Sequence, residues 1–245
     1  MIFRTPFILP WLYPGLWWRV PVVEKEIFLT FDDGPVPGPT EFVLDQLEKA
    51  RAKATFFCIG DNVAKHPAIF QNVVSQGHAI GNHTFNHLKG WNCSVPDYLA
   101  NVRRCQDEFR KQLLTPAYSP DFAKASSPGQ ASGKAGPSPK GEGGLARRSR
   151  GVGGLFRPPY GRIKRSQIRA LTEFTIVMWD VLSHDYSKTI SPERCLRGSV
   201  QATRPGSIVV FHDSLKAEKN MCYVLPRFLD HFSRLGYSFK ALPNS

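Results

Sequence analysis

Two adjacent carboxylates, Asp32 and Asp33, follow a run of strand-forming residues at 27–31 and precede a Gly-Pro pair at 34–35. Both acids are therefore expected at the point where a buried strand reaches the surface. Like charges this close repel each other and raise each other's pKa unless a cation or a metal neutralises them. The pair predicts partners elsewhere in the chain. The alternative is that Asp simply ends the strand and begins a loop.

His83 and His87 are four residues apart in the sequence His-Thr-Phe-Asn-His. On a helical turn, side chains at i and i+4 share a face, so both rings would point at one ion. One aspartate of the pair would complete a set of two histidines and one carboxylate, which suits a catalytic zinc or another first-row divalent metal. The other aspartate would stay free to accept a proton from water. Two unrelated histidines in a turn are the alternative.

Two further groups also follow expected strands. Arg157 opens the sequence Arg-Pro-Pro-Tyr-Gly, in which a cation able to hold a carboxylate precedes a rigid backbone that can present an N–H group to an oxyanion. His212 follows the apolar run 207–211, and histidine is a suitable general acid for an amine leaving group. All these groups fall at the carboxyl ends of expected strands, where barrels of parallel strands build their active sites.

Strands and helices are expected to alternate along the chain, as is typical of βαβ units in a parallel sheet. Apolar and β-branched runs predict strands at 27–31, 54–60, 78–81, 155–157, 175–179, 207–211 and 238–242. Helical spacing of apolar residues predicts helices at 40–52, with Thr40 as the cap, and at 67–75, 96–113, 163–171, 192–202 and around 225–232. About seven such units favour an α/β barrel over an open sheet.

Two segments depart from this alternation. Residues 118–154 are rich in Gly, Pro and Ser, a composition that cannot bury enough apolar surface to offset its ordering entropy, so a disordered surface insertion is expected. Residues 1–23 are aromatic and apolar, but prolines interrupt the run 7–18, which is too short for a membrane span and makes a poor signal peptide. This run is expected either to pack over one end of the domain or to contact a membrane peripherally.

Composition bounds the remaining possibilities. With 245 residues, of which 42% are hydrophobic, the chain can build one full-sized core. The net charge of +12 suggests an acidic partner or a locally basic segment, and because 118–154 supplies part of it, no nucleic-acid partner is expected. The five cysteines contain no C-x-x-C pair and predict free thiols. A monomer is expected, located in the cytoplasm or peripherally at the cell envelope, since no export signal is found.

Four ordered motifs resemble those of the NodB-type polysaccharide deacetylases, carbohydrate esterase family four. They are Thr-Phe-Asp-Asp-Gly at 30–34, the histidine motif at 83–87, Arg-Pro-Pro-Tyr-Gly at 157–161 and Val-Phe-His-Asp at 210–213. Their order and spacing agree with the family over about residues 24–242, apart from the inserted segment before Arg157. The resemblance implies a deacetylase domain at 24–245, folded as a distorted (β/α)7–8 barrel, behind an N-terminal aromatic segment at 1–23.

The resemblance also implies roles for the polar residues. Asp32 would be the catalytic base, oriented by Arg157, and the metal would be held by Asp33, His83 and His87. Zinc is the expected metal, with cobalt, nickel, manganese and iron as alternatives.

The remaining implied roles concern the leaving group and the substrate. His212 would be the general acid, tuned by Asp185, and the backbone N–H near Tyr160 would help to hold the oxyanion. Further substrate contacts are implied for three residues: Pro159, Tyr186 and Phe211.

One motif departs from the family pattern. The family usually shows Asp-Ser-x-Asp-Trp, whereas residues 182–186 read Leu-Ser-His-Asp-Tyr. The second acid is kept as Asp185, the first is replaced by Leu182, and the aromatic wall changes from Trp to Tyr186. These changes bear on substrate preference more than on catalysis.

The implied activity is metal-dependent hydrolysis of N-acetyl groups on N-acetylglucosamine units of peptidoglycan, chitin or a related glycan, with release of acetate. An O-acetyl esterase or a small-molecule amidase using the same site is one alternative. A non-catalytic glycan-binding member of the fold is the other.

Overall fold

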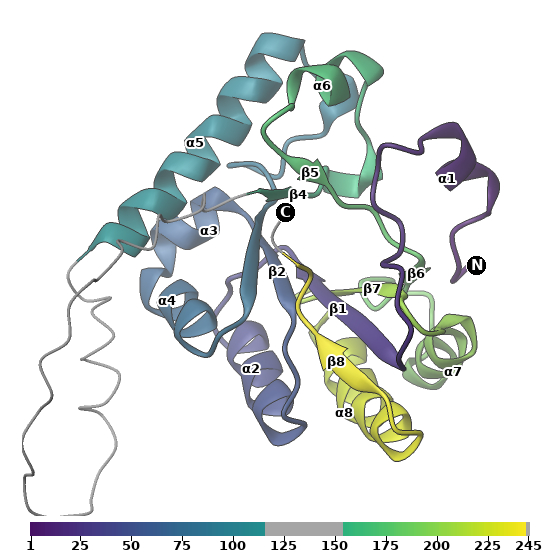
Figure 1. Cartoon of the computed structure of the whole chain (residues 1–245). Helices are drawn as coiled ribbons and strands as arrows, with labels where there is room; N and C mark the ends of the chain where they lie inside the picture. The colour runs from purple at the N-terminus through teal and green to yellow at the C-terminus, as the bar shows by residue number, and fades with distance from the viewer. Residues whose placement is uncertain (116–153, 244–245) are drawn as a thin grey trace, which may run out of the picture.

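A computed structural model describes residues 1–115 and 154–243 of the chain (Figure 1). Apart from Gly154, the insertion expected at 118–154 lies outside these residues, so its disorder stays a prediction.

The described residues form one eight-stranded sheet in which every pair of neighbouring strands is parallel. Its strands are β1 (Glu26–Asp32), β2 (Thr55–Cys58), β3 (Ala79–Asn82), β4 (Leu155–Phe156), β5 (Thr175–Ile176), β6 (Val181–Leu182), β7 (Ile208–His212) and β8 (Ser238–Lys240). The order is β5-β4-β3-β2-β1-β7-β6, with β8 paired to the first half of β1. Because β1 pairs with β2, β7 and β8, the strand that carries the two aspartates lies at the centre of the sheet.

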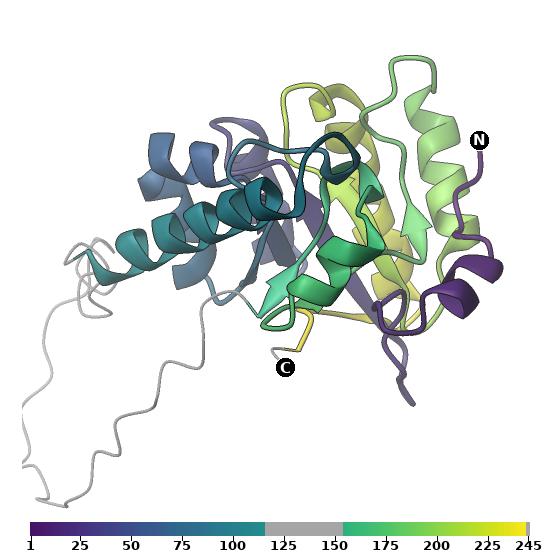
Figure 2. The same ribbon diagram turned by 90° about the horizontal axis from the view of Figure 1, so that it is seen from above.

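Helices connect and cover these strands (Figure 2). They are α1 (Ile8–Leu12), α2 (Pro39–Lys49), α3 (Gly60–Lys65), α4 (Pro67–Ser75), α5 (Val95–Leu114), α6 (Arg165–Ala170), α7 (Pro192–Ala202) and α8 (Glu218–Arg234), with 3₁₀ turns at Gly90–Asn92 and Pro159–Gly161. In both ribbon views α3, α4 and α5 gather at one end of the sheet, while α7 lies at the other end beside β6.

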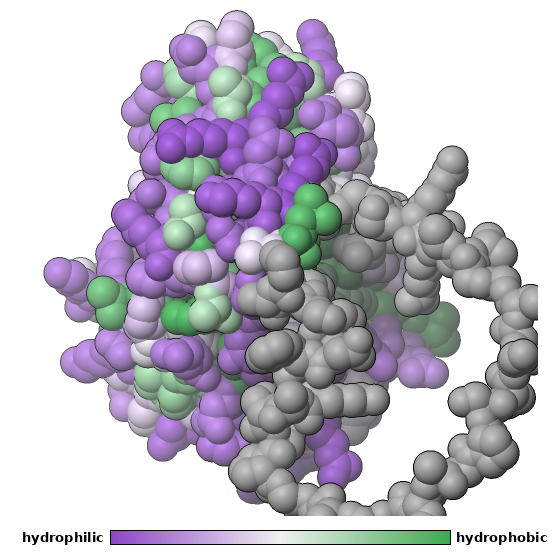
Figure 3. Space-filling view, turned by 90° about the vertical axis from the view of Figure 1, so that its left-hand side faces the viewer, coloured by the Kyte–Doolittle hydropathy of each residue, from purple (hydrophilic) through white to green (hydrophobic). Residues whose placement is uncertain are grey.

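The apolar core lies between the sheet and its helices. Phe31 on β1 stacks between Phe56 on β2 and Phe211 on β7, and Phe211 in turn meets Phe228 of α8 edge-on. The outer surface of the molecule on the side of α4 and α5 is mostly hydrophilic (Figure 3). All five cysteines are free, as predicted.

The predicted α/β class with a barrel-like parallel sheet is confirmed, and so are the bounds of α4 and α7. The short elements α1, α3 and β6 were not predicted, because segments of two to six residues carry too little periodicity. Thr40 is not the cap of α2. The helix begins at Pro39 after Gly38, and the Thr40 hydroxyl instead accepts a hydrogen bond from the Val36 N–H (2.7 Å).

The N-terminal segment, residues 1–23, packs against the sheet where β5 and β6 do not pair with each other. Trp17 forms a parallel bridge to Val177, which follows β5, and Arg4 forms an antiparallel bridge to Val181 of β6. The expectation that this segment covers one end of the domain is therefore confirmed. Its side chains Phe7 and Trp11 are exposed, so the expected membrane contact stays a prediction. Among the described residues, no helix is both long and apolar enough to cross a bilayer.

The docking of this segment predicts that substitution by alanine lowers the free energy of unfolding more at one glycine than at another. Gly206 and Gly236 both have positive φ, at 79° and 77°. A Cβ at Gly206 would meet the Val20 carbonyl oxygen at 2.1 Å, whereas one at Gly236 would meet nothing within 4 Å. Gly236→Ala should cost about 1 kcal/mol of unfolding free energy from backbone strain alone, and Gly206→Ala about 2 kcal/mol or more. Urea denaturation of both variants measures this difference. Equal losses would show that residue 20 does not pack on Gly206.

Candidate active site

One cavity, of about 490 Å³, collects most of the predicted site residues at the carboxyl ends of the central strands. We call it the rim cavity. Seven of the predicted residues line it: Asp32, Asp33, His83, His87, Tyr160, Tyr186 and His212. Two others, Arg157 and Asp185, are buried behind this lining and hydrogen-bond to Asp32 and His212. The strand register explains why two of these residues lie together, because Asp32 of β1 is directly opposite His212 of β7.

Asp32 is held by a fully buried arginine. Arg157 Nη1 donates to Asp32 Oδ1 (2.7 Å) and to Thr30 Oγ1 (2.7 Å), and its other nitrogens donate to the carbonyl oxygens of Val177 (3.3 Å) and Met178 (2.8 Å). Burial alone would raise the pKa of the Asp32 carboxyl, but the charge and hydrogen bond of Arg157, together with His83 and His212, outweigh it, and the pKa is lowered. Asp32 is therefore an ionised carboxylate with a fixed orientation.

Asp33 turns away from its neighbour toward the two histidines. Its Oδ1 lies 3.2 Å from His87 Nε2 and 3.8 Å from His83 Nε2. The segment 83–87 is a loop and not the helical turn expected from the i, i+4 spacing. Thr84 and His87 have φ values of 63° and 55°, and this left-handed backbone brings the two ring centroids to 5.1 Å. The convergence of the rings was predicted for the wrong reason.

These three side chains fit a divalent metal. Each offers one ligand atom, and the three atoms lie within 4.8 Å of one another. His83 Nδ1 lies 2.8 Å from the Arg157 carbonyl oxygen, which can only accept, so Nδ1 carries the hydrogen and Nε2 presents its lone pair toward Asp33. Burial lowers the pKa of His83 to about 4 and also lowers that of His87, which keeps both rings neutral as ligands require.

His212 lies on the other side of Asp32 and is bound twice by Asp185. The His212 ring Nδ1 and Asp185 Oδ1 are 2.7 Å apart, and the His212 backbone N–H donates to Asp185 Oδ2 (2.7 Å). Burial would lower the pKa of His212, but the charge and hydrogen bond of Asp185, with Asp33 and Asp32 beyond, raise it to about 9. At neutral pH the ring is a protonated imidazolium whose Nδ1 is engaged, which leaves Nε2–H as the remaining donor.

The predicted substrate residues divide into two groups. Tyr160 and Tyr186 line the rim cavity, with Tyr160 against His87 (ring centroids 4.6 Å) and Tyr186 against His212 (4.9 Å). Pro159 and Phe211 are buried and do not line it. Side chains alternate along β7, so Val210 and His212 face the cavity while Phe211 faces the core. The substrate contacts expected of Pro159 and Phe211 therefore stay predictions, without support from the cavity lining.

Several positioning residues were missed by sequence reasoning. Asp213 is fully buried, which raises its pKa to about 8, and its carboxyl group accepts from the Gly34 N–H (3.0 Å) and from Thr40 Oγ1 (2.7 Å), which fixes the turn after Asp33. Asn62 Nδ2 donates to the Asp33 carbonyl oxygen (2.7 Å). The place of Asp213 directly after His212 was a usable signal, whereas nothing in the sequence pattern singled out Asn62.

Backbone strain concentrates at this site. Six non-glycine residues among those described have positive φ, and five of them belong to the site motifs: Asp33, Thr84, His87, Tyr160 and His184. Such conformations cost free energy and persist where surrounding contacts hold them, which occurs mainly at functional sites.

Three comparisons with known proteins agree with this geometry. The model of the polysaccharide deacetylase family matches residues 19–120. A peptidoglycan-N-acetylglucosamine deacetylase of Bacillus cereus is 30% identical over 226 residues, covering 91% of this chain and 88% of its own. A chitooligosaccharide deacetylase of Bradyrhizobium is 31% identical over 192 residues, covering 77% of this chain and 71% of its own.

A solved structure is similar over nearly the whole chain. The crystal structure of a peptidoglycan N-acetylglucosamine deacetylase, in complex with a naphthyl-substituted N-hydroxybenzamide, superposes with a TM-score of 0.74 at 26% identity. The match covers 98% of this chain and 95% of that one.

The donor geometry predicts a metal-binding defect. His87→Ala removes one of three ligands and should lower zinc affinity by at least about a hundredfold. Calorimetric titration of zinc into metal-free protein measures the affinity. The matched control is His231→Ala, on the outer face of α8, which should bind zinc as the parent protein does. Equal zinc affinity in His87→Ala and the parent would contradict the predicted ligand set.

Proposed function

Since the chain belongs to the polysaccharide deacetylase family and is a hydrolase of carbon–nitrogen bonds, we propose that it removes N-acetyl groups from N-acetylglucosamine units of a glycan and releases acetate. The activities for which its relatives are named support peptidoglycan or chito-oligosaccharides as the substrate class. One observation carries the proposal: a potential metal triad, an arginine-held carboxylate and a carboxylate-held histidine face a single cavity.

The metal would be held by Asp33, His83 and His87. Two neutral imidazoles and one carboxylate suit zinc, and also cobalt, nickel, manganese or iron in the divalent state. When bound, the ion supplies Lewis acidity, which polarises the acyl carbonyl and makes water easier to deprotonate.

Asp32 is the proposed general base. It takes a proton from the water molecule as the water oxygen bonds to the acetyl carbon. Arg157 keeps the carboxylate ionised and points Oδ1 through a 2.7 Å hydrogen bond, so the second oxygen is free for the water. Because Asp32 is buried and fixed, little reorganisation is needed when charge develops.

His212 is the proposed general acid. The C–N bond can break only if the amine is protonated as it leaves, and the imidazolium supplies that proton from Nε2. Asp185 holds Nδ1 and stabilises the charged ring before transfer. Tyr160 would donate its backbone N–H to the carbonyl oxygen as that oxygen becomes negative, while Tyr186 and Val210 would contact the acetyl group from the cavity wall.

The role of Asp32 is tested by Asp32→Asn. Acetate release from N-acetylated chito-oligosaccharides should fall by about 100-fold to 10,000-fold, because the base is lost, while zinc affinity should persist. Enzymatic acetate detection and calorimetry measure the two effects. Acetylated xylan serves as the parallel O-acetyl substrate. Faster acetate release from xylan than from the chito-oligosaccharides would favour an esterase, and a near-normal rate in Asp32→Asn would refute the assignment of the base.

The pairing of His212 with Asp185 predicts a shift in pH dependence. A general acid works only while protonated, so activity should fall as pH rises through the pKa of His212, which Asp185 raises to about 9. Asp185→Asn removes the raising charge and leaves the opposing effect of burial, so the alkaline limb of kcat should move to lower pH.

The matched control is Asp180→Asn. Asp180 is also buried, but it pairs with Arg19 and Arg204, away from His212. The alkaline limb of the kcat profile of Asp180→Asn should match that of the parent enzyme. Identical limbs in both variants would exclude Asp185 as the residue that tunes the acid.

A further inference from the structure

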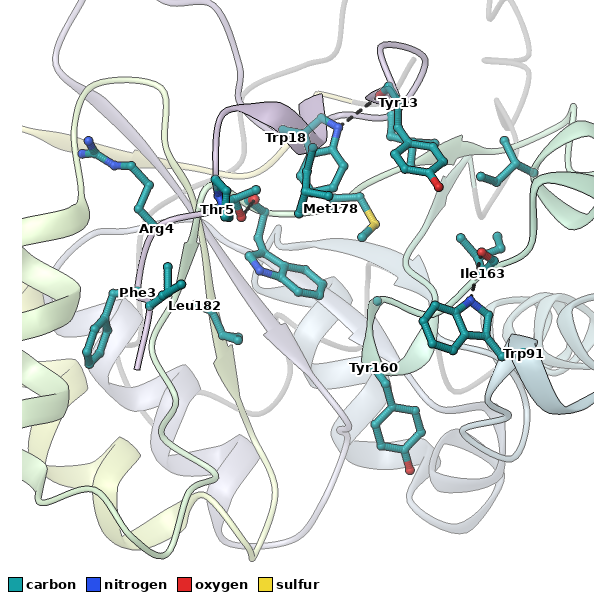
Figure 4. A pocket seen from close by; sticks show the side chains of 17 residues that line it. Phe3, Arg4, Thr5, Tyr13, Trp18, Trp91, Tyr160, Ile163, Met178 and Leu182 are labelled. Carbon is teal, nitrogen blue, oxygen red and sulfur yellow. Dashed lines mark hydrogen bonds between the residues drawn. The ribbon is translucent and has the colours of Figure 1, made fainter. Parts of the chain in front are cut away.

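A second cavity, of about 350 Å³, lies between the N-terminal segment and the loops that follow β4 and β5 (Figure 4). We call it the apolar cavity, because aliphatic and aromatic side chains make up most of its lining. Leu9, Tyr13 and Leu16 come from the N-terminal segment, and Ile163 and Met178 from the facing loops. Its volume lies at the lower end of the range typical of small-molecule pockets, about 300–1,000 Å³.

Four of the seven polar side chains in this lining already have hydrogen-bond partners. The Thr5 hydroxyl donates to the Trp179 carbonyl (2.7 Å), Trp18 Nε1 to the Tyr13 carbonyl (3.2 Å) and Trp91 Nε1 to the Ile163 carbonyl (3.3 Å). The Arg4 guanidinium donates to the Ala202 carbonyl. A sugar ring requires several polar groups that bind its hydroxyls, and most of the polar side chains of this lining are engaged with backbone carbonyls, so the cavity suits a hydrocarbon chain better.

The cavity has a buried floor and an exposed rim. Leu16, Trp18 and Met178 are each at most 8% exposed. Tyr160 and Trp91 are 61% and 55% exposed, and Figure 4 shows both on the side away from Tyr13 and Trp18. A ligand can therefore enter from the surface and bury its apolar part against the floor.

The apolar cavity shares a wall with the rim cavity. Tyr160, Gly161, Trp179 and Leu182 line both. Leu182 replaces the first acid of the family pattern at residues 182–186, so this wall is apolar where a carboxylate is expected. A chain attached to a molecule that reacts in the rim cavity can therefore lie along Trp179 and Leu182 without passing a charged side chain of the shared wall.

We propose that the apolar cavity binds an alkyl chain of the substrate, and that the enzyme prefers amphiphilic N-acylated amino sugars over the unsubstituted sugar. This inference rests on the proposed function and specifies its substrate class. The chain can be attached at the acyl carbon, as an N-acyl group longer than acetyl, or at the anomeric oxygen, as a glycoside. The same hydrocarbon chemistry serves both attachments.

Two substrate series distinguish the attachments. One compares methyl with n-octyl N-acetyl-β-glucosaminide, and the other compares N-acetyl with N-hexanoyl methyl glucosaminide, below the concentrations at which the amphiphiles form micelles. Each methylene group buried should raise kcat/KM by up to about fourfold. In at least one series, kcat/KM of the long-chain substrate should exceed that of the short-chain substrate by at least about tenfold. A ratio of long-chain to short-chain kcat/KM near one in both series, with normal turnover of the methyl N-acetyl substrate, would overturn the inference and leave the proposed function intact.

Variants of the N-terminal segment test whether the alkyl chain of the substrate binds in the apolar cavity. Leu9→Asp places a carboxylate in the apolar cavity, and Leu9→Trp fills part of its space. Both should lower the ratio of long-chain to short-chain kcat/KM, by about tenfold for Leu9→Asp. The matched control is Ile8→Asp on the same helix, since Ile8 is 48% exposed and does not line the cavity, and its ratio should equal that of the parent. An unchanged ratio in both Leu9 variants would overturn the inference.

A binding measurement decides the inference even if no glycan is turned over. Calorimetry with Asp32→Asn compares the affinities of the octyl and methyl N-acetyl-β-glucosaminides without hydrolysis. Tighter binding of the octyl compound, lost in Leu9→Trp, supports the apolar cavity as its site. Equal affinities for the two glycosides would count against it, whatever the outcome for acetate release.

Discussion

The buried ion pair between Arg157 and Asp32 is the interaction on which the rest of the site depends. A guanidinium without solvent contact is costly unless a carboxylate and further acceptors compensate it. Here Asp32, Thr30 and two carbonyl groups after β5 accept its hydrogen bonds, and the ring of Phe57 lies 4.1 Å below it. The arginine thereby ties β1, β2 and β5 to the end of β4. Its carbonyl also fixes the tautomer of His83, so the same residue orients both the proposed base and a proposed metal ligand.

The environment separates the roles of two aspartates that are identical in sequence terms. Asp32 ends a buried strand and faces a cation, so it remains ionised with one fixed orientation. Asp33 has a φ of 82°, which turns its side chain toward His83 and His87. The turn that makes this possible is held by Asp213 through the Gly34 N–H. The two adjacent carboxylates face different partners, a guanidinium for Asp32 and two imidazoles for Asp33, and this division of partners is what suits one for proton transfer and the other for binding a cation.

The sequence predicted the contents of the site better than its geometry. Apolar periodicity located most strands and helices, and chemistry-bearing residues after strands were expected at one rim, because parallel strands place their carboxyl ends together. Backbone conformation was beyond reach: the helical turn expected at 83–87 is a loop with two left-handed residues, since tertiary contacts hold a conformation that local propensity disfavours. Strand alternation also matters, because the neighbours Phe211 and His212 face opposite sides of β7, and of these two only the His212 side chain lines the cavity.

The N-terminal segment contributes to the cavity proposed for substrate selection and not to the cavity proposed for catalysis. Its bridges to Val177 and Val181 pair residues about 160 and 177 positions apart, which no local pattern can predict. None of residues 1–23 lines the rim cavity, whereas several line the apolar cavity. The groups proposed for proton transfer and metal binding belong to the strand ends and their loops, fixed by buried hydrogen bonds. The segment can therefore change its apolar side chains without disturbing those bonds. Selection for the non-reacting part of a substrate can vary along this segment while the Arg157–Asp32 pair and the histidine cluster stay fixed.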